Sequence, residues 1–253
     1  RGPTDRALRG RPAGRAAARA AGTGVDWLFI DQEHGPFARA SVLQLLQALA
    51  AYVLRTLVRA ACDAPTLLKK LLDVGAQTLV IPMVNTAEQA EALVQAVSYP
   101  PRGIRGIGTS MARAARWNQA PGYAQSANEE ICLIVQAETT QALSNLDDIL
   151  AVDGVDGVFI GPSDLAASMG HLGNPGHPDV ISAIDNTLQR ISAAGKYAGV
   201  FCMAAELAQH YIDQGANFLA VGSDTMALSQ GLRQVAASFR GEPLEEEKPK
   251  AGY

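Results

Sequence analysis

The chain alternates short, nearly continuous apolar runs with segments of helical periodicity along most of its 253 residues. Continuous apolar runs are typical of parallel strands that are covered on both faces. Several of the helical segments stop at a glycine, which is a common helix C-cap. This alternation predicts a parallel α/β protein that closes into a barrel. We expect strands over residues 26–31, 54–60, 77–84, 131–138, 157–162, 197–202 and 218–224.

An eight-stranded barrel needs one strand more than the seven that this pattern predicts. The missing strand should lie within residues 1–24, but these hold six arginines and one acid and are otherwise mostly Gly, Ala and Pro. We interpret this stretch as a tail, or as a helix over 14–21. The expected fold is therefore a (β/α)8 TIM barrel whose first strand is atypical or missing. Its expected divisions are an N-terminal segment (1–20), one barrel domain (21–240) and a solvated C-terminal tail (241–253).

Charge and hydropathy exclude several classes of partner. The net charge of −4 gives no drive toward nucleic acid or anionic membranes. No apolar run approaches the roughly 18 residues that span a bilayer. The Arg-rich start is not followed by an apolar stretch, so we do not expect it to be a signal peptide. Three isolated cysteines (Cys62, Cys132, Cys202) lack metal-type spacing, so we predict buried small hydrophobes in a reducing cytoplasm.

Two carboxylates follow consecutive predicted strands, Glu138 in LIVQAE and Asp164 in GVFIGPSD. Parallel barrels place their chemistry at the C-terminal ends of the strands, where such side chains converge. Two acids there can hold a hard divalent cation and leave coordination positions open for a substrate. The alternative is that each acid caps the helix that follows it. Spacing alone leaves both interpretations open.

Two neighbouring features bear on the same end of the barrel. Gln136 lies two residues before Glu138, so both side chains face the same side of the strand. The turn Gly161-Pro162-Ser163 precedes Asp164, and backbone amides in such a turn can bind a small carboxylate.

A second group follows the first two predicted strands. His34, beside Asp31 and Glu33, is a candidate general base, although a histidine at a strand end can equally be structural or exposed. Arg59 suits a carboxylate or an enolate, and the alternative is a salt bridge to Asp31. Asp73 lies near a helix C-terminus, which is unfavourable for an acid, so we expect it to have a partner such as His34 or Arg59.

Other motifs receive no role. The glycine-rich run 103–108 has neither of the usual nucleotide-binding spacings, and we expect its Arg105 to be solvated, or else to reach the far end of a substrate. His171, His177 and His210 lack metal-type spacing.

Taken together, IDQEHGPF, LLDVGAQTLVIPMV, IVQAET and GVFIGPSDLAASMG resemble the class II pyruvate aldolases of the 4-hydroxy-2-oxoheptanedioate and 2-dehydro-3-deoxyglucarate aldolase family. The resemblance runs from about residue 21 to residue 240. It implies a (β/α)8 barrel of the phosphoenolpyruvate/pyruvate type, a hexamer, and a Mg²⁺, Mn²⁺ or Co²⁺ ion. It also implies a cytoplasmic enzyme of aromatic-compound or sugar-acid catabolism.

The resemblance also implies a role for each matching residue. A 4-hydroxy-2-oxo acid would be cleaved to pyruvate and an aldehyde through a metal-stabilised pyruvate enolate. By motif, the metal ligands are Glu138 and Asp164, the base is His34, the enolate-binding arginine is Arg59, the orienting acid is Asp73, and the pyruvate pocket is lined by Gln136, Gly161, Pro162 and Ser163.

Two departures from the family pattern motivate the alternative of a barrel that has lost its activity. Gln32 stands where a glycine is usual, and would crowd the base loop if the backbone there needs a glycine conformation. The apolar first strand is also absent from the sequence. One alternative is a related lyase of the phosphoenolpyruvate or acyl-CoA type on the same barrel, and another is an inactive barrel that serves as an oligomer subunit.

Overall fold

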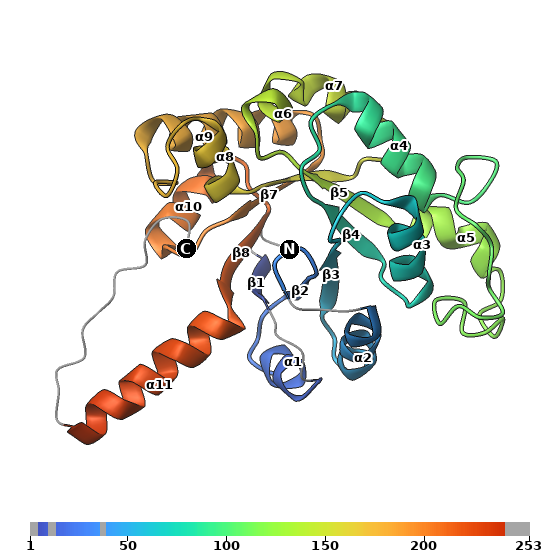
Figure 1. The fold of residues 1–253 in the computed structure, drawn as a ribbon, viewed down its shortest axis with the longest axis horizontal. Helices are drawn as coiled ribbons and strands as arrows, with labels where there is room; N and C mark the ends of the chain where they lie inside the picture. The colour runs from blue at the N-terminus through green and yellow to red at the C-terminus, as the bar shows by residue number, and fades with distance from the viewer. Residues whose placement is uncertain (1–4, 10–13, 36–38, 241–253) are drawn as a thin grey trace.

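Eight parallel strands form a closed barrel in the computed structural model, which describes residues 5–9, 14–35 and 39–240 (Figure 1). Each strand pairs in parallel with its neighbours in sequence, and the first strand also pairs with the last. The strands are β1 (Asp5–Arg9), β2 (Trp27–Asp31), β3 (Arg55–Arg59), β4 (Thr78–Ile81), β5 (Cys132–Gln136), β6 (Gly157–Ile160), β7 (Tyr197–Phe201) and β8 (Phe218–Ser223). The predicted barrel is therefore confirmed.

The first strand lies in the segment where the sequence did not predict one. β1 occupies Asp5–Arg9, and Ala7 is in register with Trp27 of β2 and with Ala220 of β8. Strand propensity is a weak guide here, because two flanking strand edges offer backbone hydrogen-bond partners to any extended segment. The helix expected over 14–21 follows it as α1 (Gly14–Ala21).

Helices surround the barrel, and none in the described part of the chain is long and apolar enough to cross a membrane. They are α1, α2 (Arg39–Leu49), α3 (Pro65–Asp73), α4 (Ala87–Val97), α5 (Tyr123–Glu130), α6 (Thr140–Ser144), α7 (Leu146–Ala151), α8 (Pro162–Ser168), α9 (Pro178–Ala193), α10 (Ala205–Asp213) and α11 (Asp224–Arg240). A large apolar cluster joins the outer strand faces to these helices, with the exception of α5 and α11.

A second apolar cluster fills the inside of the barrel, and aromatic rings make up much of it. Trp27, Phe29, Phe159 and Phe218 form ring pairs with centroids 5.7 to 6.0 Å apart. Gly199 on β7 makes room for this packing, because a Cβ atom there would lie 2.1 Å from Cζ of Phe218. The interior is thus a packed core, and a substrate site must lie at an end of the barrel.

The last helix, α11, differs from the other long helices because it projects away from the barrel (Figure 1). None of its residues is buried. Leu228, Leu232, Val235 and Phe239 are all exposed, and their spacing places them on one face of the helix. The helix therefore presents an uncovered apolar stripe.

The three cysteines differ in exposure, so the prediction that all are buried is wrong for one of them. Cys62 is exposed, Cys132 is partly buried and Cys202 is buried, and none is in a disulfide. Burial raises the pKa of the Cys132 thiol to about 12 and that of Cys202 to about 11. The thiolate is the reactive form, so among these three cysteines Cys62 is the one that a reagent in solution can reach readily.

We expect an aromatic disulfide reagent at pH 8 to modify one thiol per folded chain rapidly and all three after denaturation. The raised pKa values leave Cys132 and Cys202 almost entirely protonated at that pH, and reactivity should increase only as the pH rises toward those values. Absorbance of the released thiolate measures the count. Cys62→Ser is the control and should remove the rapid phase, and two rapid thiols in the unmodified chain would contradict the assignment.

Candidate active site

A buried arginine organises the C-terminal ends of β2, β3 and β5. Arg59, the last residue of β3, binds both carboxylate oxygens of Asp31, with Nε 2.8 Å from Oδ1 and Nη2 2.6 Å from Oδ2. Its Nη1 lies 2.8 Å from Oε2 of Glu33 and 3.3 Å from Oε1 of Gln136. The Asp31 pair that the sequence left open as an alternative is therefore present, and it does not exclude a binding role.

The electrostatics of Arg59 keep it charged. Burial by itself lowers the pKa of this guanidinium, but the hydrogen bonds and charge of Asp31, with the charges of Glu33 and Glu138, raise it above its ordinary value. A permanently charged fork with fixed donors is suited to stabilising an anion beside it.

The loop after β2 is shaped by the same Asp31 carboxylate. Oδ1 of Asp31 accepts hydrogen bonds from the backbone N–H groups of Glu33 (3.1 Å) and His34 (3.4 Å). The His34 side chain is 57% exposed, and its Nε2 lies 3.8 Å from Oε2 of Glu33. Gln32 does not adopt a left-handed conformation, so this position does not require glycine. The loop thus presents an imidazole at the barrel mouth next to a carboxylate.

Glu138 is buried just beyond β5, and both of its oxygens are held. Nε2 of Gln136 donates to Oε2 at 2.6 Å, and the backbone N–H of Met83, beyond β4, donates to Oε1 at 2.9 Å. Burial raises the pKa of Glu138 to about 7, and the charges of Asp164 and Glu33 act in the same direction. The N–H of Met83 and the charge of Arg59 oppose this shift. Negative charge is therefore crowded at this point.

The turn after β6 brings Asp164 toward the same place. Gly161 is the N-cap of α8, and a Cβ atom on it would lie 2.3 Å from Oε2 of Glu138. Asp164 is exposed in the first turn of α8, where a helix dipole favours a negative charge. Neither acid is an N-cap: Thr139 caps α6, and Gly161 caps α8 without a side-chain bond.

Asp73 is not brought to His34 within the chain. It ends α3, and because the helices run antiparallel to the strands, this end lies on the side of the barrel where strands begin. Its Oδ1 accepts from Nη2 of Arg105 at 3.1 Å. Arg105 is 1% exposed, and its Cζ lies 4.3 Å from the centroid of the Tyr99 ring. The expectation of a solvated loop arginine is therefore wrong. The ring face and the carboxylate together allow this cation to be buried.

The histidines without a predicted role do not form a convincing metal site. His171, His177 and Asp179 place ligand-type atoms within 4.8 Å of one another. The two imidazole rings are stacked, however, with centroids 3.6 Å apart and planes 15° apart. The nitrogen lone pairs of the two rings lie in these nearly parallel planes, so they cannot both point at one metal ion. Nδ1 of His177 already accepts the backbone N–H of Asp179 and so caps α9.

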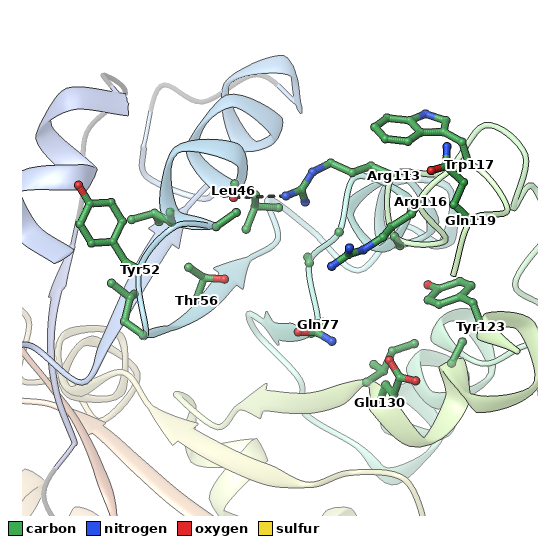
Figure 2. Close-up of a pocket in the computed structure, with 18 residues that line it drawn as sticks. Leu46, Tyr52, Thr56, Gln77, Arg113, Arg116, Trp117, Gln119, Tyr123 and Glu130 are labelled. Atoms are coloured by element: carbon green, nitrogen blue, oxygen red, sulfur yellow. Dashed lines mark hydrogen bonds between the residues drawn. The ribbon is translucent and has the colours of Figure 1, made fainter. Parts of the chain in front are cut away.

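A hollow in the described part of the chain lies at the other end of the barrel (Figure 2). Its volume is about 650 Å³, and it is lined at the starts of β3 and β4 and by α5. Figure 2 shows Arg113 reaching the backbone oxygen of Leu46, a 3.5 Å bond, and Arg116 beside it. None of the predicted site residues lines this hollow. Because chemistry in parallel barrels is found at the C-terminal ends of strands, we assign the candidate site to the Arg59 and Glu138 end.

Comparison with known proteins agrees with this geometry. Residues 13–231 match the family described as HpcH/HpaI aldolase/citrate lyase. The chain therefore belongs to the HpcH/HpaI aldolase/citrate lyase family, and the predicted resemblance and the aldolase class are confirmed.

Three relatives illustrate the match. A hydroxypyruvate/pyruvate aldolase of Deinococcus radiodurans is 55% identical over 91% of this chain and 83% of its own. A 4-hydroxy-2-oxo-heptane-1,7-dioate aldolase of Klebsiella pneumoniae is 52% identical over 87% of this chain and 83% of its own. The crystal structure of a family protein from Burkholderia cenocepacia has a TM-score of 0.89 at 36% identity, covering 93% of this chain and 94% of its own.

The sequence missed two contributors to the site. Glu33 was named only as a neighbour of His34, yet it is a third anchor of Arg59, and its place in the same short loop was the available signal. The Met83 contact is made by main chain, so no side-chain pattern could have revealed it.

We expect Arg59→Ala to lower the free energy of unfolding by roughly 3–5 kcal/mol, because it removes the buried guanidinium that pairs with both carboxylate oxygens of Asp31. Denaturant titration followed by circular dichroism measures the change.

The control for this substitution is Arg102→Ala, which breaks an ion pair between side chains that are 44% and 97% exposed. Exposed pairs contribute about 1 kcal/mol or less. An equal loss of unfolding free energy in the two variants would show that the buried ion pair contributes no more to stability than the exposed one.

Proposed function

We propose that this protein is a metal-dependent pyruvate aldolase that cleaves a 4-hydroxy-2-oxo acid to pyruvate and an aldehyde through the pyruvate enolate. The observation that carries the proposal is the buried Glu138 carboxylate beside Asp164, within the same network as Arg59. Relatives at 52–55% identity that are named as aldolases of this kind support the reaction class.

A divalent cation fits the chemistry of the donor set. Glu138 and Asp164 are hard oxygen ligands, and the raised pKa of Glu138 reflects burial together with unrelieved repulsion from neighbouring acids. A cation between the two carboxylates would relieve that repulsion. A bound Mg²⁺, Mn²⁺ or Co²⁺ ion would act as a Lewis acid that polarises the 2-keto oxygen of the substrate.

The protein side chains have separate roles in the proposed reaction. His34 removes the proton of the C4 hydroxyl, and the bond between C3 and C4 then breaks to release the aldehyde. Arg59 stabilises the negative charge that develops on the enolate oxygen, and Asp31 and Glu33 fix its position. Gln136 holds Glu138 and faces the pyruvate pocket.

The remainder of the proposed pocket is the turn after β6. Gly161, Pro162 and Ser163 would line the pocket for the pyruvate carboxylate, with the N–H groups of the glycine and serine as donors.

The proposed orienting role of Asp73 differs from these roles, because Asp73 contacts Arg105 and not His34 within the chain. It would require Asp73 of one copy to approach His34 of another.

The two alternatives make different predictions. A phosphoenolpyruvate- or acyl-CoA-type lyase would need a basic cradle at the barrel mouth, whereas Arg59 there is committed to Asp31 and Glu33. An inactive barrel would be expected to lose members of the site, whereas the base, the arginine and both acids remain.

We expect release of pyruvate from 4-hydroxy-2-oxo acids to stop on treatment with EDTA and to return with Mn²⁺, Co²⁺ or Mg²⁺. Glu138→Gln should lower kcat/KM by at least 100-fold, because the amide retains the size of the side chain but not its charge. A coupled lactate dehydrogenase assay follows the pyruvate. Cleavage that survives both treatments would exclude the metal-dependent reaction.

A control variant and a substrate panel complete this experiment. Glu88→Gln, an exposed acid in the first turn of α4, should leave kcat/KM unchanged. A panel of succinic semialdehyde, tartronate semialdehyde and simple aldehydes, each with pyruvate or hydroxypyruvate as the other reactant, identifies the preferred substrates.

We propose further that the chain forms a homo-oligomer, a hexamer by family resemblance, through α11. The projecting helix and its uncovered apolar stripe support this, since exposed apolar patches mark interaction surfaces. The choice of metal, the cytoplasmic location and the catabolic role remain predictions from the same resemblance.

Light scattering should therefore give a mass several times that of one chain, and Leu232→Glu should reduce it by placing a charge within the stripe. Gln234→Glu, on the opposite face of α11, is the matched control and should not change the mass. A monomeric parent protein, or an unaltered assembly in the Leu232 variant, would refute the role of α11.

A further inference from the structure

Met83 is unusual in both conformation and position. It lies just beyond β4 with φ of 58°, in the left-handed region that residues other than glycine rarely adopt. Its backbone N–H donates to Oε1 of Glu138 at 2.9 Å, and its side chain is 48% exposed. The side chain therefore gains little from burial, while the main chain contacts a carboxylate of the candidate active site.

The left-handed conformation is unfavourable by itself and must be maintained by its surroundings. A left-handed residue with a side chain costs roughly 1–2 kcal/mol, and such residues gather at functional sites. Here the neighbouring Val84 donates its N–H to the backbone oxygen of Gln136 at 3.1 Å. Asn85 donates from Nδ2 to the backbone oxygen of Met83 at 3.0 Å.

Asn85 also connects this turn to the segment after Glu138. Its Oδ1 accepts a hydrogen bond from the hydroxyl of Thr139, the N-cap of α6. Its backbone oxygen accepts from Nδ2 of Asn145 at 2.8 Å. The turn after β4 is thus fixed to the residues that follow β5, and the Met83 N–H and Glu138 are held in one unit.

The other side of the carboxylate is equally restricted. Nε2 of Gln136 binds Oε2, and the missing Cβ of Gly161 leaves the space that Oε2 occupies. Rotation of the carboxylate would break the contact with Met83, with Gln136 or with both. The direction of the remaining lone pairs is therefore set by these two donors.

We propose that Met83 is a positioning residue whose left-handed main chain aims its N–H at Glu138 and so fixes the orientation in which that carboxylate binds a divalent ion. The inference rests on the proposed metal-dependent function and concerns the backbone of Met83. Outer partners that orient metal ligands typically change metal affinity by about 10–100-fold when lost.

The test compares side chains that differ in their tolerance of the left-handed region. Met83→Gly accepts this conformation freely, Met83→Leu retains an unbranched Cβ, and Met83→Val has a β-branch that disfavours it. We expect Mn²⁺ affinity, measured by calorimetry without substrate, to stay within about threefold of the parent protein in the Gly and Leu variants. The Val variant should bind Mn²⁺ roughly 10–100-fold more weakly.

A substitute variant and a parallel measurement of stability make the outcome decisive. If Met83→Val does not fold, Asn85→Ala replaces it, because it removes the side chain that holds the Met83 backbone oxygen. Thermal unfolding without metal, measured in parallel, separates loss of stability from loss of affinity. Weaker Mn²⁺ binding at unchanged melting temperature supports the positioning role.

Glu138→Gln distinguishes failure of this inference from failure of the proposed function. If it binds Mn²⁺ as well as the parent protein does, the metal site itself is wrong and both proposals fall. If it loses binding while the Val variant, or Asn85→Ala in its place, keeps parental affinity, the role of Met83 alone is overturned.

Discussion

The buried ion pair between Arg59 and Asp31 is the interaction on which the rest of the site depends. Asp31 holds the arginine through two bonds and at the same time fixes the backbone of the loop that carries His34. Arg59 in turn reaches Gln136, which holds Glu138. Burying charges is unfavourable unless each is paired, so these strand ends must assemble together. Fold and site are coupled through one guanidinium group.

The site balances opposite charges across a short distance. Asp31 and Glu33 surround the permanently charged Arg59, whereas burial, together with the charges of Asp164 and Glu33, raises the pKa of Glu138 to about 7. The group around Arg59 therefore contains its own cation, whereas the pair Glu138 and Asp164 would be stabilised by binding one. The enolate of the proposed reaction would form where the two regions meet.

Sequence reasoning was most successful where side-chain pattern determines structure. The seven predicted strands follow apolar periodicity, and the barrel topology then places Arg59, Gln136 and Glu138 at one end. It failed where neighbours decide the outcome. β1 forms from a sequence of low strand propensity because two strand edges pair with it, and Arg105 is buried because Tyr99 and Asp73 receive it. The Met83 contact depends on a dihedral angle that the residue type does not encode.

The pairing of Gly199 with Phe218 inside the barrel has an evolutionary consequence. The ring occupies the space where a side chain at position 199 would lie, so the two positions share one volume. A methyl group added at position 199 requires a smaller residue at position 218, since the packed interior has no spare room there. Within the family, we expect these two positions to change in concert, as a compensating pair that bears on barrel closure and not on catalysis.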